Sequence, residues 1–300
     1  MTKGYHNPVL LKETVGGLNI REDGVYVDVT FGGGGHSKEI LDRLGEKGRL
    51  IAFDQDQDAL LNIIDDSRFT LINENFRYLK RFLRFHGVMK VDGILADFGV
   101  SSHQFDVAER GFSIRFDGEL DMRMNRQDEL SAYHVINEYD EEQLRQVLKE
   151  YGELRQAPAI ARVIVAERKT QNIKTTDQLK NVLKKFLPPR RENKILAQIY
   201  QAIRIEVNQE IEALKEFLTQ TPELLDVGGR LSFISYHSLE DRLVKRFIRN
   251  GMFEGEPEKD VFGNFEVPFK KVGKLIVPGQ EEIEINNRAR SAKLRIAERI

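Results

Sequence analysis

The chain has 300 residues and a mass of 34.6 kDa, enough to bury a large core in one large domain or two smaller ones. Its net charge is −2, so the chain as a whole is not a strongly basic nucleic-acid binder. The absence of cysteine excludes disulfides, thiolate metal sites and cysteine nucleophiles. No apolar run approaches the roughly 20 residues that cross a bilayer, and the first residues lack the apolar core of a signal peptide. We therefore expect a cytoplasmic protein with no membrane partner.

Short runs of apolar, β-branched and aromatic residues alternate with helix-like segments over the first 100 residues. This alternation is typical of an α/β fold with a doubly wound, mostly parallel sheet. The strands are expected at 25–31, 49–54, 69–73 and 91–98, with a fifth at 228–236 and a last one at 292–297.

Strands four and five are separated by roughly 130 residues, far more than an ordinary crossover needs. Apolar residues recur there at three- and four-residue spacing, which predicts helices, with Asp140 and Thr176 as N-caps. We expect an inserted all-helical domain over 105–198, between the two parts of a sheet domain, 1–104 and 199–300.

A glycine run is the most informative local pattern. The strand at 25–31 leads into four consecutive glycines, and Ser37 lies in the expected start of the next helix. Glycine lets the main chain approach a ligand closely, so a strand, a glycine turn and a helix N-terminus favour a nucleotide-type cofactor. Asp54 lies 22 residues after Gly32, the spacing at which an acid binds a ribose diol. Helix capping is the alternative role for this acid.

Two cofactor classes fit this pattern: nicotinamide or flavin dinucleotides, and S-adenosylmethionine. The spacing Asp28-x-Thr30-x-Gly32-x-Gly34 resembles the first motif of class I methyltransferases, where an acid and glycine main chain accommodate the aminoacyl part of S-adenosylmethionine. An acid suits an ammonium and sulfonium ligand better than a pyrophosphate. Thr30 stands where that motif usually has its first glycine.

Seven motifs in order make the resemblance more specific. They are His6-Asn-Pro-Val-Leu-Leu, Thr30-Phe-Gly-Gly-Gly-Gly-His-Ser37, Asp97-Phe-Gly-Val-Ser-Ser102, Glu109-Arg-Gly-Phe-Ser113, Asp121-Met-Arg-Met124, Ser235-Tyr-His-Ser-Leu-Glu-Asp-Arg242 and Asn287-Arg-Ala-Arg-Ser-Ala-Lys-Leu-Arg295. With them the chain resembles, almost end to end, the RsmH (MraW) family of bacterial ribosomal RNA methyltransferases. The resemblance implies methyl transfer from S-adenosylmethionine to the exocyclic N4 amine of a cytidine in 16S ribosomal RNA, near the decoding centre. It also implies that the helical insert recognises the substrate.

The family resemblance further implies a set of cofactor contacts: Gly34, Gly35, His36, Asp54, Phe76, Asp97 and Gln104. Phe76 can cover an adenine face, whereas His36 can equally cap or pack at a helix start. Asp97 is also the catalytic candidate, because amino-methyltransferases resembling this class carry an Asp/Asn/Ser-Pro-Pro-aromatic motif at this strand end. Phe98, Gly99 and Val100 replace the rest of that motif. Phe98 and Phe112 are therefore candidates for base stacking or, at least equally, ordinary core aromatics.

The other polar clusters favour structural roles. His237 and Glu240 suggest acid–base chemistry, but a capping box with Ser238 as N-cap and Asp241 at N3 is favoured. Two acids four residues apart, Asp117 and Asp121, are typical of surface groups, and no metal is expected.

Basic residues cluster twice, at 180–205 and 286–300. The segments around 184–194 and 288–295 within them are hypothesised to contact RNA phosphates. A charge run is also typical of a merely solvated face. The expected partner is 16S ribosomal RNA within the small subunit, and the sequence does not decide between a monomer and a homodimer. Two other functions stay open: a dinucleotide-dependent oxidoreductase and a non-catalytic RNA-binding assembly factor.

Overall fold

The computed structural model describes residues 8–258, 260 and 265–300. Its contacts divide the chain into a sheet unit, Met1–Gly99 with Ile211–Ile300, and a helical unit, Val100–Glu210. The sequence placed these boundaries at 104/105 and 198/199. The helical unit extends beyond those limits because Val100 packs against its core and one long helix contributes to that core as far as Val207.

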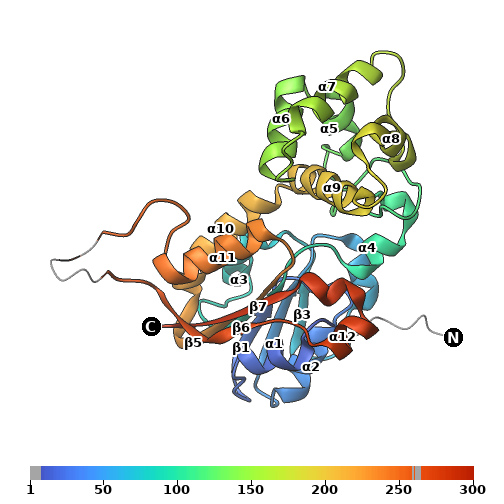
Figure 1. Cartoon of the computed structure of the whole chain (residues 1–300). Helices are drawn as coiled ribbons and strands as arrows, with labels where there is room; N and C mark the ends of the chain where they lie inside the picture. The colour runs from blue at the N-terminus through green and yellow to red at the C-terminus, as the bar shows by residue number, and fades with distance from the viewer. Residues whose placement is uncertain (1–7, 259, 261–264) are drawn as a thin grey trace. The chain divides into compact units, whose positions relative to one another are not determined.

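The sheet unit contains a seven-stranded sheet in the order β3-β2-β1-β4-β5-β7-β6 (Figure 1). Strands β1 to β5 run parallel to one another, and β7 is antiparallel to both β5 and β6. The strands are β1 Val25–Asp28, β2 Arg49–Phe53, β3 Phe69–Ile72, β4 Val91–Asp97, β5 Leu225–Ser235, β6 Phe269–Ile276 and β7 Lys293–Arg299. The prediction of a doubly wound, mostly parallel sheet is confirmed.

Strand β6 was not predicted from the sequence. Five of its eight residues are exposed, and it carries three lysines in place of a regular apolar alternation. It is an edge strand, and lysines on an edge strand discourage pairing with further chains.

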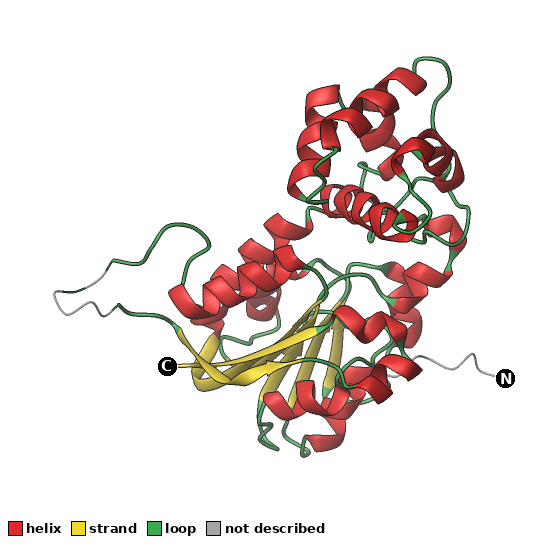
Figure 2. Ribbon diagram, in the orientation of Figure 1, coloured by secondary structure: helices red, strands yellow, loops and turns green. Residues whose placement is uncertain are grey.

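Helices cover both faces of the sheet, as Figure 2 shows. On one face α3, α10 and α11 pack their apolar side chains against β1, β2, β4 and β5, and on the other face α1 and α2 do the same. The helices of this unit are α1 Leu11–Gly17, α2 Gly35–Arg43, α3 Leu79–Phe85, α10 Glu210–Leu224, α11 Ser238–Asn250 and α12 Gln280–Ile285, with 3-10 helices η1 Gln57–Asn62, η2 Phe76–Tyr78 and η5 Asn287–Ser291.

The helical unit has its own apolar core, which is built from all of its longer helices. Its elements are α4 Ser102–Asp106, α5 Ala132–Glu138, α6 Glu141–Glu150, α7 Ala157–Glu167, α8 Thr176–Val182 and α9 Glu192–Asn208, with 3-10 helices η3 Ala108–Arg110 and η4 Lys184–Phe186. Asp140 caps α6 as predicted, but the N-cap of α8 is Thr175 and not Thr176. Helix α9 ends at Asn208, because Gln209 has a left-handed φ of 49°.

Asp117 and Asp121 both have partners within this unit, and Asp121 is buried, with 6% of its surface exposed. The Asp117 carboxylate accepts a hydrogen bond from Asp177 N at the start of α8 (3.0 Å). The Asp121 carboxylate pairs with Arg123 (2.6 Å). None of the helices in the described part of the chain is both long and apolar enough to span a membrane.

Aromatic rings fill the core under the carboxyl end of β4. Phe98 packs against Phe217 of α10 and Phe233 of β5, with ring centroids 6.1 and 5.6 Å apart. Phe217 also contacts Phe76 at 5.3 Å. The four rings form one group behind the strand ends where the sequence places the cofactor.

Replacing Phe217 by Ala should lower the free energy of unfolding by about 3–5 kcal/mol, because it leaves a cavity in this fully buried group. Chemical denaturation monitored by circular dichroism measures the change. The control is Phe85→Ala, whose ring is 82% exposed and should shift stability by less than about 0.5 kcal/mol. Equal effects of the two variants would contradict this account of the core.

Candidate active site

The glycine loop joins β1 to α2 with backbone angles that only glycine adopts easily. Gly32 has φ of 50° and Gly34 has φ of 75°. A Cβ at Gly35 would lie 2.1 Å from Pro8 Cγ, so this position is restricted by close packing. Helix α2 begins directly after Gly34, and among the residues that the structure describes no side chain caps its first amides. Those amides are suited to bind a ligand at this helix start.

Asp28 organises this loop from within. Its side chain is fully buried, and it accepts hydrogen bonds from Ser37 Oγ (2.7 Å) and Thr30 N (3.1 Å). Burial raises the pKa of this carboxyl above its ordinary value. The expectation that the Asp28 side chain touches the aminoacyl part of the cofactor is therefore wrong, because this side chain has no exposed surface. Asp28 instead shapes the loop.

Asp54 closes the loop from the end of β2. Its Oδ2 accepts from Gly32 N (2.7 Å), and its Oδ1 accepts from Asp56 N (2.9 Å). Burial raises the pKa of Asp54 to about 6, with the nearby carboxylates acting in the same direction and the two backbone hydrogen bonds against it. The N-cap of η1 is Asp56, so capping does not account for Asp54. Each Asp54 oxygen keeps a lone pair with which to accept from a diol.

Phe76 and Asp97 lie at the ends of the next two strands in the chain. The half-buried ring of Phe76 packs on Phe98, which directly follows Asp97, with centroids 6.0 Å apart. Asp97 N donates to Thr30 Oγ1 (2.6 Å), so the threonine that replaces the usual glycine joins the ends of β1 and β4. A glycine there would leave this amide without that acceptor.

The Asp97 carboxylate is held at one oxygen. Its Oδ1 accepts from the Tyr236 hydroxyl (2.7 Å), and its Oδ2 lies 4.0 Å from His36 Nδ1. The side chain is 23% exposed, so the carboxylate is reachable from solvent. Burial raises the pKa of Asp97 to about 6, although the charge of His36 and the Tyr236 hydrogen bond lower it.

His36 is buried and packs at the start of α2. Its Nε2 lies 3.1 Å from the carbonyl oxygen of Val9. Because a carbonyl oxygen only accepts, this ring nitrogen carries a proton, and Nδ1 faces Asp97. Of the two roles that the sequence left for His36, contact with the cofactor stays a prediction, whereas its packing is observed.

Gln104 belongs to the helical unit, whereas the other six predicted contacts belong to the sheet unit. It is 4% exposed and closes a capping box at the start of α4, where Gln104 Oε1 accepts from Ser101 N (3.0 Å). Its contact with a cofactor stays a prediction. Phe98 and Phe112, the two candidate stacking residues, are each 4% exposed and belong to the cores of their respective units, so the ordinary core role is the one observed.

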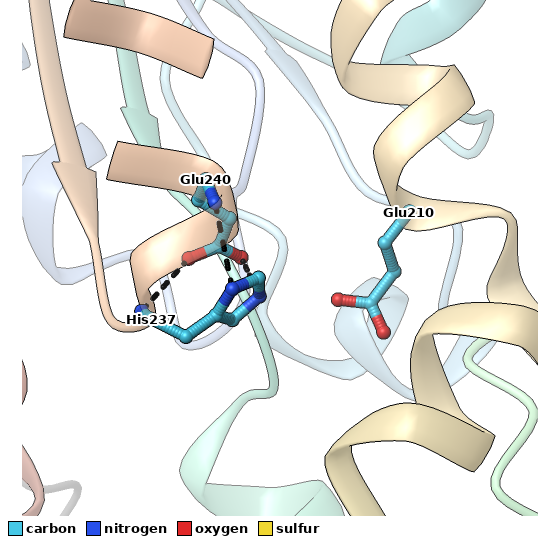
Figure 3. A group of neighbouring side chains, drawn as sticks. All are labelled: Glu210, His237 and Glu240. Atoms are coloured by element: carbon cyan, nitrogen blue, oxygen red, sulfur yellow. Dashed lines mark hydrogen bonds and ion pairs between the residues drawn. The ribbon is translucent and has the colours of Figure 1, made fainter. Parts of the chain in front are cut away.

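The start of α11 differs from its prediction. His237, not Ser238, is the N-cap, and Glu240 rather than Asp241 is at N3 (Figure 3). His237 Nε2 lies 3.0 Å from Glu240 Oε1, and Glu240 Oε2 accepts from Tyr236 N (2.9 Å). Asp241 instead pairs with Arg295 of β7 (2.8 Å).

Tyr236 and the bridging role of Thr30 were missed at the sequence level. Strand β5 is parallel to β4, so its carboxyl end meets the same edge of the sheet. Applying the strand-end argument to the fifth strand as well as to the first four would have found Tyr236. No comparable sequence pattern indicates the role of the Thr30 hydroxyl, because its partner is a backbone amide.

A sheet of this order, with a glycine loop after β1 and acids after β2 and β4, is the arrangement of a class I S-adenosylmethionine-dependent methyltransferase. The residues fit the cofactor: uncapped helix amides and the Asp54 carboxylate line the strand ends. The chain belongs to the MraW methylase family, whose model matches residues 3–300. The first of the seven motifs begins at His6, outside the described residues.

Named relatives are similar along their whole length. A protein from Flavobacterium johnsoniae called ribosomal RNA small subunit methyltransferase H is 72% identical, covering 100% of this chain and 99% of its own. A protein of the same name from Bacteroides thetaiotaomicron is 56% identical, covering 98% and 97%. Membership of a methylase family decides against the dinucleotide-dependent oxidoreductase and does not favour the non-catalytic assembly factor.

Replacing Asp54 by Asn should weaken S-adenosylmethionine binding by on the order of 10–100-fold, because a charged acceptor for a diol is lost and the Gly32 amide loses its ionic partner. Isothermal titration calorimetry measures the affinity. Asp65→Asn, an exposed acid of the same unit, serves as the control and should bind normally. An unchanged affinity in the Asp54 variant would remove that residue from the binding site.

Proposed function

We propose that this enzyme transfers the methyl group of S-adenosylmethionine to the exocyclic N4 amine of a cytidine in 16S ribosomal RNA of the small subunit. The observation that carries the proposal is the Asp97 carboxylate, held by Tyr236 at the end of β4 beside the glycine loop. The names of the whole-length relatives support the ribosomal RNA target. The seven-motif resemblance supports the amine as the reacting group.

The reaction needs few groups from the protein. When bound, S-adenosylmethionine supplies an electrophilic methyl group on a positively charged sulfur. Asp97 accepts a hydrogen bond from the amine, which keeps electron density on the nitrogen as the N–C bond forms and the C–S bond breaks. The proton that the amine loses leaves toward this carboxylate. The target cytidine must be unpaired or flipped out for its amine to reach the methyl group.

This chemistry agrees with the composition of the chain. Methyl transfer to ring carbon C5 of a pyrimidine normally uses a cysteine nucleophile, and the chain has none. Attack by an exocyclic amine needs no covalent intermediate. The direct test is transfer of labelled methyl groups onto small ribosomal subunits that lack the modification, followed by mapping of the modified base. Label on a base other than cytidine, or at C5, would contradict the proposal.

Replacing Asp97 by Ala should lower kcat by about 100–1,000-fold, because the acceptor for the amine is lost from the transition state. A single-turnover methyl-transfer assay at saturating S-adenosylmethionine measures this step. The Asp65→Ala variant controls for the loss of an exposed acid elsewhere in the unit. Calorimetry should show that the Asp97 variant still binds the cofactor, and near-normal transfer would overturn its catalytic role.

We further propose that a basic segment of the helical unit contacts RNA phosphates. Five of its basic side chains are exposed: Lys184, Lys185, Arg190, Arg191 and Lys194. The acid within it, Glu192, pairs with Lys180 (2.8 Å). Arg204 was counted with this segment in the sequence, but it pairs with Glu210 (2.7 Å) and is partly buried. The exposed five therefore form the segment's candidate phosphate contacts.

In the second basic cluster, 286–300, most of the basic side chains form ion pairs or hydrogen bonds within the sheet unit. Lys293 and Arg295 both pair with Asp241, and Arg299 donates to the carbonyl oxygens of Pro222 and Pro268. The hypothesis that 288–295 forms a phosphate track is therefore not supported for Lys293 and Arg295. Their charges hold β7 against the neighbouring elements.

Replacing Arg190 and Arg191 together by Gln should make the salt dependence of RNA binding shallower by about 1.4–1.8 in the slope of log K against log salt, because two phosphate contacts are lost. Fluorescence anisotropy with 16S ribosomal RNA at several salt concentrations measures the slope. The paired replacement of Lys149 and Lys169, exposed lysines of the same unit, should leave the slope unchanged. Equal slopes in the arginine variant and the wild type would exclude this segment.

A further inference from the structure

Tyr236 and Asp97 meet because they end neighbouring parallel strands. Asp97 pairs with Ile234 across β4 and β5, and Tyr236 follows two residues later. The phenol oxygen donates to Asp97 Oδ1 at 2.7 Å. On the backbone side, Asp97 N is fixed by Thr30 Oγ1. Both the main chain and one carboxylate oxygen of Asp97 are therefore held, and no hydrogen bond to Oδ2 is found among the described residues.

Tyr236 is itself held in place by the start of α11. Its backbone N donates to Glu240 Oε2 (2.9 Å), and Glu240 is the N3 residue of the capping box with His237, as Figure 3 shows. Glu240 is 3% exposed, so this anchor is part of the packed interior. Burial beside Asp97 raises the pKa of the Tyr236 phenol well above its ordinary value. The hydroxyl therefore stays a hydrogen-bond donor at every pH at which the enzyme is assayed.

We propose that Tyr236 is a positioning residue for methyl transfer: its hydroxyl holds Asp97 so that Oδ2 points its free lone pairs at the target amine. The inference rests on the catalytic role proposed for Asp97. Tyr236 does not touch the reacting atoms in this account. It acts on the orientation and the charge state of the carboxylate that does, because a donor at Oδ1 stabilises the ionised form.

Four titratable groups face Asp97, each from a different element. Tyr236, after β5, and His36, on α2, stabilise the carboxylate, whereas Asp28 on β1 and Glu240 on α11 destabilise it. Burial outweighs the first two and raises the pKa of Asp97 to about 6. As the pH falls through this value the carboxyl is protonated and the acceptor is lost. The wild-type rate should therefore fall on the acid side near pH 6.

The test is the pH dependence of kcat in Tyr236→Phe, measured with saturating S-adenosylmethionine. Loss of the hydroxyl removes an interaction that lowers the pKa of Asp97. The acid limb of the pH–rate profile, the range in which kcat falls with falling pH, should therefore move to higher pH by about one unit. Well above the limb, where Asp97 is ionised in both proteins, the rates should differ by less than about tenfold. At pH 6 the variant should be slower by a larger factor than at pH 8.5.

A matched control separates this effect from general loss of a tyrosine hydrogen bond. Tyr139 donates to Glu206 Oε1 at the same 2.7 Å, but within the helical unit. Tyr139→Phe removes the same kind of contact, and its acid limb should stay at the wild-type position. A limb that moves equally in both variants would overturn the inference, since the shift would then not pass through Asp97.

A titration without turnover distinguishes failure of this inference from failure of the proposed function. Carbon-13 NMR of the Asp97 carboxyl should show the same upward shift of its midpoint in Tyr236→Phe, with no RNA present. If the midpoint stays at its wild-type value, the positioning role is wrong. If the midpoint moves but the acid limb of kcat does not, Tyr236 tunes Asp97 without affecting transfer, which also overturns the role. Absence of any methyl transfer to ribosomal RNA by the wild type would instead contradict the proposed function.

Discussion

The buried carboxylate of Asp28 is the constraint on which the rest of the active site depends. It ties Thr30 on one side and Ser37 on the other, so the end of β1 and the first turn of α2 are fixed to the same group. The glycines between them then have to turn within a few residues, which explains the left-handed angles at Gly32 and Gly34. A buried acid satisfied in this way costs less than an unpaired one and fixes the loop geometry.

From this loop the site extends across the sheet through short contacts between strand ends. Thr30 accepts a hydrogen bond from the backbone of Asp97 at the end of β4, and Gly32 donates one to Asp54 just after β2. Asp97 in turn accepts a hydrogen bond from Tyr236 after β5. Parallel strands bring their carboxyl ends to one edge, so residues distant in sequence become neighbours there. Burial raises the pKa of Asp54 and of Asp97 to about 6, so the acid proposed for cofactor binding and the acid proposed for catalysis titrate over the same pH range.

Charge counts from the sequence did not reveal which basic residues are free to bind RNA. Arg204 and Arg295 belong to the two basic clusters, yet each is partly buried and paired with an acid of its own unit. Arg190 and Arg191 are exposed at the start of α9 and keep their charge at the surface. Exposed charges of this kind can release counterions when a phosphate binds.

The sequence by itself determined the five parallel strands, the helical insert and the family, because long apolar runs and several rigid motifs leave few alternatives. It also predicted seven cofactor contacts, and six of them, all except Gln104, lie in the sheet unit at the glycine loop or near the strand ends. The contacts themselves stay a prediction. Only the tertiary structure decided the rest. The partner of Asp97 lies 139 residues away at Tyr236, the cap of α11 moved by one residue to His237, and the exposed edge strand β6 has no apolar pattern to reveal it. Such contacts depend on how side chains meet across elements, and local sequence carries no record of that.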